Sequence, residues 1–81
     1  MIQSLLAEFV GSAIIMLGFR YFHSLPILLV IYVIAKTITL AHLNPLVTLW
    51  YYLQGKMNIT TSVLYLIAQI LPVVIIAKTD L

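Results

Sequence analysis

The residues of this chain that could do chemistry are few, and the most informative of them are an asparagine and a proline within hydrophobic sequence. Asn44 and Pro45 follow Ala41, His42 and Leu43 and precede another apolar stretch. Asparagine is a favoured N-cap, and proline is favoured at the first position of a helix. The pair predicts a helix that begins inside apolar sequence, and such a helix suits a membrane in which a short helix starts halfway through the bilayer.

Other polar side chains offer no arrangement for catalysis. A serine or threonine nucleophile needs a nearby base that a third group orients, but the two carboxylates are Glu8 in an apolar segment and Asp80 in the C-terminal tail. His23 and His42 have no carboxylate near them in sequence, and the chain has no cysteine, which makes a poor set of metal ligands. We therefore expect no enzyme activity, no metal site and no cofactor.

The composition indicates whether water or lipid surrounds the protein. Of the 81 residues, 64% are hydrophobic and 7% are charged, whereas soluble domains carry about 25% charged residues. This predicts an integral, multi-pass membrane protein whose main partner is the lipid bilayer. Four cations and two anions are too few to form a basic surface for nucleic acid, which is not an expected partner.

The length allows one domain over residues 1–81. A spanning helix needs about 20 residues, and we expect spans over about residues 2–22, 25–38 and 58–77. The first has no cationic region before it, so we interpret it as a retained span rather than a cleaved signal. A fourth helix, over about 45–53, is only half a bilayer long at about 1.5 Å per residue. It should start deep and end at a surface.

Small and charged residues complete the expected packing. Ala7, Gly11 and Gly18 lie on one face of the first span, where a neighbouring helix backbone could come close. Lys36 should mark the membrane surface, with its ammonium turned outward. Arg20, Lys56 and Lys78 are expected as anchors at the interfaces.

Three blocks of the chain resemble the N-terminal repeat of the aquaporin (major intrinsic protein) family. They are Ala7-Glu8-Phe9-Val10-Gly11-Ser12, Ala41-His42-Leu43-Asn44-Pro45-Leu46-Val47-Thr48-Leu49 and Leu64-Tyr65-Leu66-Ile67-Ala68-Gln69. They occur in the family's order and cover nearly the whole chain. The resemblance implies an all-α membrane protein with three transmembrane helices plus one re-entrant half-helix, which is half of an aquaporin-like fold.

The resemblance also implies roles for individual residues. The pore-lining set is Thr39, Leu40, Ala41, His42, Leu43, Asn44, Pro45 and Leu46. Of these, Asn44 would present its amide to the permeating molecule and Pro45 would set the start of the half-helix, while backbone carbonyls of residues 39–43 would face the pore. Glu8, Gly11 and Gln69 would have structural roles, with Glu8 bracing the non-helical stretch.

The chain departs from the family's pattern at several of these positions. Leu46 stands where the family has alanine, Leu40 where glycine is usual, and Lys36 where a small residue is usual. The family's selectivity arginine belongs to its second repeat, and Val47 follows Leu46 here, so no residue takes that role. Rejection of protons and cations would then depend on the half-helix dipoles.

Several simpler interpretations stay open. Asn44 and Pro45 could form an ordinary turn between two spans, and Glu8 is near enough to the end of its span to reach water. Gln69 could bond to a neighbouring helix rather than to a substrate, and we favour that packing role.

The leading functional hypothesis is a passive channel for water or a small neutral solute. One such repeat cannot enclose a pore, so we expect a homo-oligomer. Arg20 and Lys78 on one side balance Lys36 and Lys56 on the other, so no positive-inside bias fixes the orientation, and an inverted, antiparallel homodimer is favoured. The alternative is a non-conducting structural subunit of a viral membrane or a larger complex. A third class, a small lytic protein of the holin type, gives no reason for Asn44 and Pro45.

Overall fold

The computed structural model describes residues 1–39 and 41–79. It contains four helices, α1 (Ile2–Tyr21), α2 (Leu25–Thr39), α3 (Pro45–Leu53) and α4 (Ile59–Ala77), and the described residues form no strand. This confirms the all-α class. Of the four, α1 and α4 are long and apolar enough to cross a membrane, while α2 is apolar but has only 15 residues.

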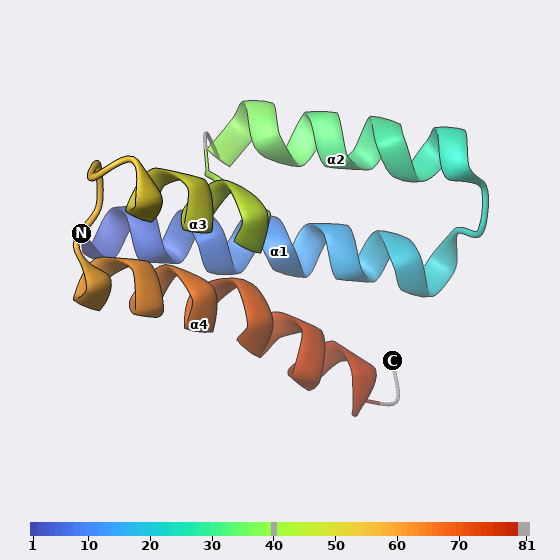
Figure 1. Ribbon diagram of the computed structural model, residues 1–81. Coiled ribbons are helices and arrows are strands. Elements are labelled where there is room, and N and C mark those ends of the chain that lie inside the picture. The colour runs from blue at the N-terminus through green and yellow to red at the C-terminus, as the bar shows by residue number, and fades with distance from the viewer. Residues whose placement is uncertain (40, 80–81) are drawn as a thin grey trace.

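The helices pack around α1. Among the described residues α1 packs against α4 and α2, and α3 packs against α4. Figure 1 shows that α3 begins level with the middle of α1 and runs, in the same direction as α2, to the end where the N-terminus lies. In the same view α2 ends before it reaches the level of that N-terminal end. The start of α3 is therefore placed about halfway along the molecule.

Local capping explains where the two later helices begin. Asn44 is extended, with φ of −154°, and its Oδ1 accepts a hydrogen bond from the Leu46 backbone N–H at 2.9 Å. Asn58 caps α4 in a similar way, because its Oδ1 accepts from the Thr61 N–H at 2.7 Å. Between them Gly55 has a positive φ of 74°, a conformation that glycine adopts at little cost. Two side-chain caps and one glycine turn thus define the α3–α4 hairpin.

The two glycines of the small-residue stripe on α1 receive side chains. A Cβ at Gly11 would collide with the Leu43 side chain, and one at Gly18 would lie 2.9 Å from Ile31 Cδ1. At Gly18 the neighbour belongs to α2, so a helix does come close to the stripe there, as expected. At Gly11 the neighbour is a side chain of the loop instead. Because each glycine lacks a Cβ, it leaves a hollow that a large aliphatic side chain fills.

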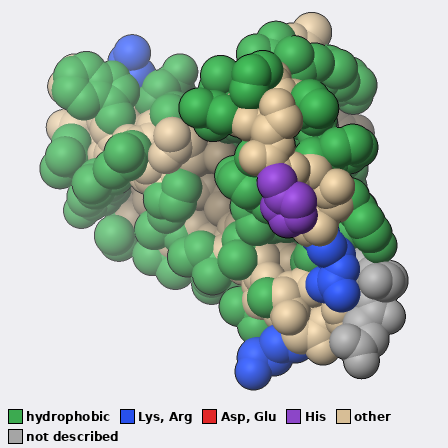
Figure 2. Space-filling model, turned by 90° about the vertical axis from the view of Figure 1, so that its right-hand side faces the viewer, with side chains coloured by type: hydrophobic (Ala, Val, Ile, Leu, Met, Phe, Trp, Pro, Cys, Tyr) green, Lys and Arg blue, Asp and Glu red, His purple; other side chains and the backbone are tan. Residues whose placement is uncertain are grey.

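The distribution of polarity differs from that in a soluble protein. Large hydrophobic side chains are exposed on every helix, and among the described residues five polar side chains are buried, namely Glu8, Ser12, Thr48, Ser62 and Gln69. Figure 2 shows the end of the molecule where α1 joins α2: hydrophobic side chains cover most of this face, and none of the described side chains seen on it is acidic. Apolar side chains on the exterior, with ionisable and other polar side chains turned inward, suit contact with lipid.

Candidate functional site

The segment between α2 and α3 has an unusual backbone. Residues 41–43 are neither helix nor strand, and Leu43 has a positive φ of 56°. A bulky residue rarely adopts that left-handed conformation, so the surrounding structure must hold it. Leu40, one of the predicted pore-lining residues, lies outside the described residues.

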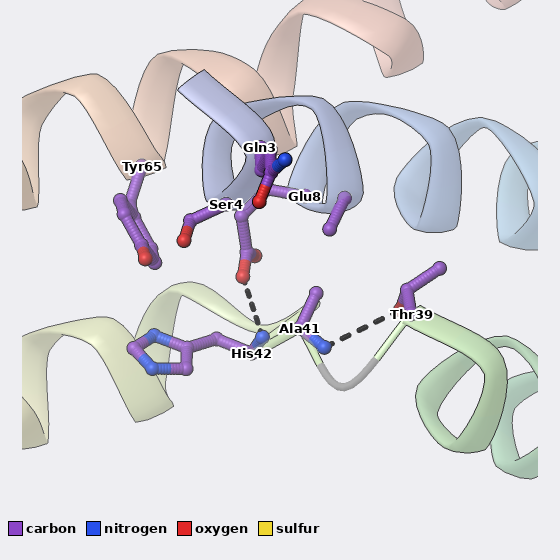
Figure 3. A pocket seen from close by; sticks show the side chains of 8 residues that line it. Gln3, Ser4, Glu8, Thr39, Ala41, His42 and Tyr65 are labelled. Atoms are coloured by element: carbon purple, nitrogen blue, oxygen red, sulfur yellow. Dashed lines mark hydrogen bonds between the residues drawn. The ribbon is translucent and has the colours of Figure 1, made fainter. Parts of the chain in front are cut away.

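Glu8 of α1 holds this backbone. Its side chain is only 1% exposed; Oε2 accepts from the His42 N–H at 2.6 Å, and Oε1 accepts from the Leu43 N–H at 3.0 Å. Figure 3 shows the carboxylate pointing at the loop, with the bond to His42 dashed. In an apolar medium each unsatisfied N–H would cost several kcal/mol. The carboxylate replaces the water that these two groups would otherwise need.

Gln69 and Thr48 extend the network to the other helices. The Gln69 Nε2 group donates to Glu8 Oε1 and to Thr48 Oγ1, each at 2.8 Å. Thr48 Oγ1 also forms a 3.0 Å hydrogen bond with His42 Nδ1. The buried polar cluster, which we define as Glu8, Thr48, Gln69 and the loop residue His42, therefore joins α1, α3 and α4 to the loop. The hydrogen bonds of Thr48 were not predicted. The sequence feature that could have indicated them is one polar residue in the first turns of an apolar helix.

The imidazole of His42 faces the helices that follow it. Its ring centroid lies 4.6 Å from that of Tyr51 and 5.1 Å from that of Tyr65. A cavity of about 280 Å³ lies beside this part of the loop, and Gln3, Ser4 and Tyr65 are among its lining residues (Figure 3). His42 thus contributes its backbone to the loop and its side chain to packing against tyrosines.

The ammonium group of Lys36 binds to carbonyls of the loop. Lys36 Nζ donates to the Ala41 carbonyl at 2.7 Å and to the His42 carbonyl at 3.4 Å. The expectation that this ammonium turns outward to the membrane surface is wrong. The reason is that α2 ends three residues after Lys36, which brings the loop within reach of its side chain. The Glu8 bonds turn the loop carbonyls toward the ammonium, and these carbonyls solvate the charge.

The remaining predicted pore residues differ in the exposure of their side chains. Asn44 is half-buried, and Pro45 and Leu46 are exposed, Leu46 by 71%. The side chains of Ala41 and Leu43 are buried, so only their backbone is available to a pore. Thr39, at the end of α2, donates its hydroxyl to the Ala35 carbonyl at 2.7 Å and accepts from the Ala41 N–H at 3.3 Å.

Asn44 uses only one end of its amide for capping. Because Oδ1 accepts from the Leu46 N–H, the Nδ2 end points away from that backbone group and can donate elsewhere. The same side chain therefore starts α3 and keeps an amide donor that the cap does not use.

Arg20 was expected to be an anchor at the membrane interface, and no metal site was expected. Arg20 is more than an anchor, because its guanidinium donates to the Ile76 carbonyl at 2.9 Å and so links the C-terminal ends of α1 and α4. Within the described part of the chain, no three His, Cys, Asp or Glu side chains come close enough together to hold a metal ion.

Comparison with known proteins gives one match. The family model described as Major intrinsic protein matches residues 16–79, which include the end of α1, the whole loop and the other three helices. No curated protein and no solved structure matched the chain. The match covers well over half of the 81 residues, and it contains the Asn44–Pro45 start of α3. The chain therefore belongs to the major intrinsic protein family, the family of aquaporin-type membrane channels that its sequence resembles.

Proposed function

We propose that this chain is a half-channel subunit for passive permeation of water or a small neutral solute. In this proposal α1, α2 and α4 are the spans and α3 is a re-entrant half-helix that starts near the middle of the bilayer. Two copies, inserted in opposite senses, enclose the pore as an antiparallel homodimer. The half-helices then meet end to end at Asn44 and Pro45.

The observation that carries the proposal is the orientation of the loop backbone. The N–H groups of His42 and Leu43 bond to Glu8, and in a trans peptide the carbonyl points opposite to the N–H of the next residue. The Ala41 and His42 carbonyls therefore face away from Glu8. Acceptors on this side and the Asn44 amide donor together suit a molecule such as water, which both donates and accepts.

The open side of the loop supports the need for a second copy. Within the described residues, α2 packs on α1 alone and α3 on α4 alone, so neither covers the other. Large apolar side chains on α2, among them Val30, Val33 and Ile34, are exposed. A partner subunit and lipid would cover these surfaces.

The test is osmotic swelling of proteoliposomes that hold the purified chain. Asn44→Asp keeps an oxygen to cap α3 but loses the Nδ2 donor, so it should lower permeability about tenfold, the value of one hydrogen bond of about 1.4 kcal/mol. Asn58→Asp makes the same change at the cap of α4 and should leave permeability unchanged. Helical content and the amount of incorporated protein must match between the samples.

One observation favours the alternative, a non-conducting structural subunit. Leu46 is exposed, and in the antiparallel dimer this bulky side chain stands where the two half-helices meet. If it closes the pore, the wild type swells no faster than empty vesicles and Leu46→Ala swells faster, whereas a structural subunit without a pore would swell no faster with either residue. Faster swelling of the wild type would exclude the structural alternative.

A further inference from the structure

We propose that Lys36 excludes cations from this pore, as a fixed positive charge bound to the carbonyls that line it. The inference rests on the proposed channel function and adds the residue that determines which solutes pass. Lys36 would act on the permeant directly, from α2, in a chain where no residue occupies the position of the family's selectivity arginine.

The geometry places the ammonium on the pore side of the loop. Lys36 Nζ bonds to the Ala41 and His42 carbonyls, the two that point away from Glu8. The Glu8 oxygens are used by the His42 and Leu43 N–H groups and by Gln69. The loop backbone thus lies between carboxylate and ammonium, and the carboxylate does not pair with this charge.

A row of carbonyls needs such a charge if the channel is to reject cations. Backbone carbonyls replace the hydration shell of a cation, which is how cation-selective filters work. An ammonium bound to the same oxygens places a positive charge where a cation would bind and repels that cation, while each carbonyl keeps a second lone pair that water can use. A neutral molecule experiences no such repulsion.

The depth of Lys36 also points to function. Ionisable side chains within membrane segments are costly and rare, and they mark pathways for solutes. Lys36 is half-buried in the last turn of α2, and α2 ends before the level of the N-terminal end of α1 (Figure 1). In an antiparallel dimer the two copies would supply one ammonium on each side of the midplane.

The experiment compares cation flux with solute swelling in the same vesicles. Lys36→Gln keeps an amide donor for the carbonyls and removes the charge. A unit charge about 6 Å from the path, at an effective dielectric of about 20, corresponds to about a hundredfold effect on entry, so the ratio of potassium flux to swelling should rise about a hundredfold. Lys36→Arg keeps the charge and should keep the ratio.

A matched control is available on the other side of α3. Lys56, which follows α3 and lies over the Tyr51 ring with Nζ 5.5 Å from its centroid, has the same side chain. Lys56→Gln removes the same charge from a side chain that, among the described residues, donates to no loop carbonyl, so the ratio should stay at the wild-type value.

A charge-rescue variant keeps the test decisive if Lys36→Gln fails to fold. The chain has no native cysteine, so Lys36→Cys can be modified with an aminoethyl thiosulfonate, which restores an ammonium, or with its methyl analogue, which does not. The charged reagent should lower the flux ratio and the neutral reagent should not.

The outcomes separate this inference from the function on which it rests. If wild-type vesicles swell no faster than empty ones, the channel and this inference both fail. If wild-type vesicles swell but Lys36→Gln lowers thermal stability and leaves the ratio of potassium flux to swelling unchanged, Lys36 merely solvates the loop and this inference alone is overturned.

Discussion

Gln69 Nε2 lies 2.8 Å from Glu8 Oε1, and this bond joins α4 to α1 at the carboxylate that holds the loop. The same nitrogen lies 2.8 Å from Thr48 Oγ1, and with two acceptors on that side the orientation of the amide is fixed. Glu8 therefore serves three donors from two elements, the loop and α4. The buried polar cluster gives the loop its shape, so its loss should be measurable as instability.

Replacing Glu8 should destabilise the fold in proportion to the donors left unpaired. Glu8→Leu removes every acceptor, and three orphaned donors at about 1 to 3 kcal/mol each give a loss of at least about 3 kcal/mol. Glu8→Gln keeps one acceptor oxygen and should lose about half as much. Thermal unfolding in detergent, followed by circular dichroism, should give the highest midpoint for the wild type, a lower one for Glu8→Gln and the lowest for Glu8→Leu. Equal midpoints for the three proteins would contradict the bracing role of Glu8.

Thr48 should matter through its hydroxyl rather than its shape. Thr48→Val preserves the volume but leaves Gln69 and His42 without this partner, at a cost of about 1 to 3 kcal/mol, whereas Thr48→Ser keeps the hydroxyl. Thr37→Val is the control, because the Thr37 hydroxyl is exposed and bonds only within α2, to the Val33 carbonyl. If Thr48→Val and Thr37→Val unfold at the same temperature, Thr48 has no special place in the cluster.

Gly11 and Leu43 should be energetically coupled. A Cβ at Gly11 would overlap the Leu43 side chain, and overpacking of this kind costs about 1 to 3 kcal/mol. Leu43→Ala makes room, so Gly11→Ala should cost less in that background, with a coupling energy of about 1 kcal/mol or more. Gly18→Ala meets Ile31 instead and should combine additively with Leu43→Ala. If the free-energy changes are additive in both double variants, Gly11 and Leu43 are not coupled.

Helix starts that depend only on neighbouring residues could be predicted from the sequence. The Asn-Pro pair indicates a helix starting at Pro45, and α3 begins there, because N-capping depends on neighbouring residues only. Lys36 could not be placed in this way: its partners are carbonyls whose direction depends on the Glu8 bonds across 34 and 35 positions of sequence. Thr48 was missed for a similar reason, since its partners come from the loop and from α4.

The charges near the helix ends predict insertion in both orientations. Arg20, bonded to the Ile76 carbonyl, and Lys78, which follows α4, lie toward one end, while Lys56, which follows α3, lies toward the other. With Lys36 held on the loop, this small imbalance leaves little positive-inside bias. Cysteines introduced by Ser24→Cys and Gln54→Cys lie in opposite connections and report the orientation through an impermeant thiol reagent in intact cells. Each should be labelled in part of the population.

Complete labelling of one cysteine and none of the other would mean a single orientation and would exclude the antiparallel dimer. Extra charge gives the sharper version of this test. Ser24→Arg and Gln54→Arg add a cation at opposite ends, so each should fix one orientation, because cations are retained on the cytoplasmic side. If the pore forms between inverted copies, cells that express either variant alone should lose the swelling response, and co-expression should restore it. Full swelling with a single fixed orientation would instead require a parallel assembly.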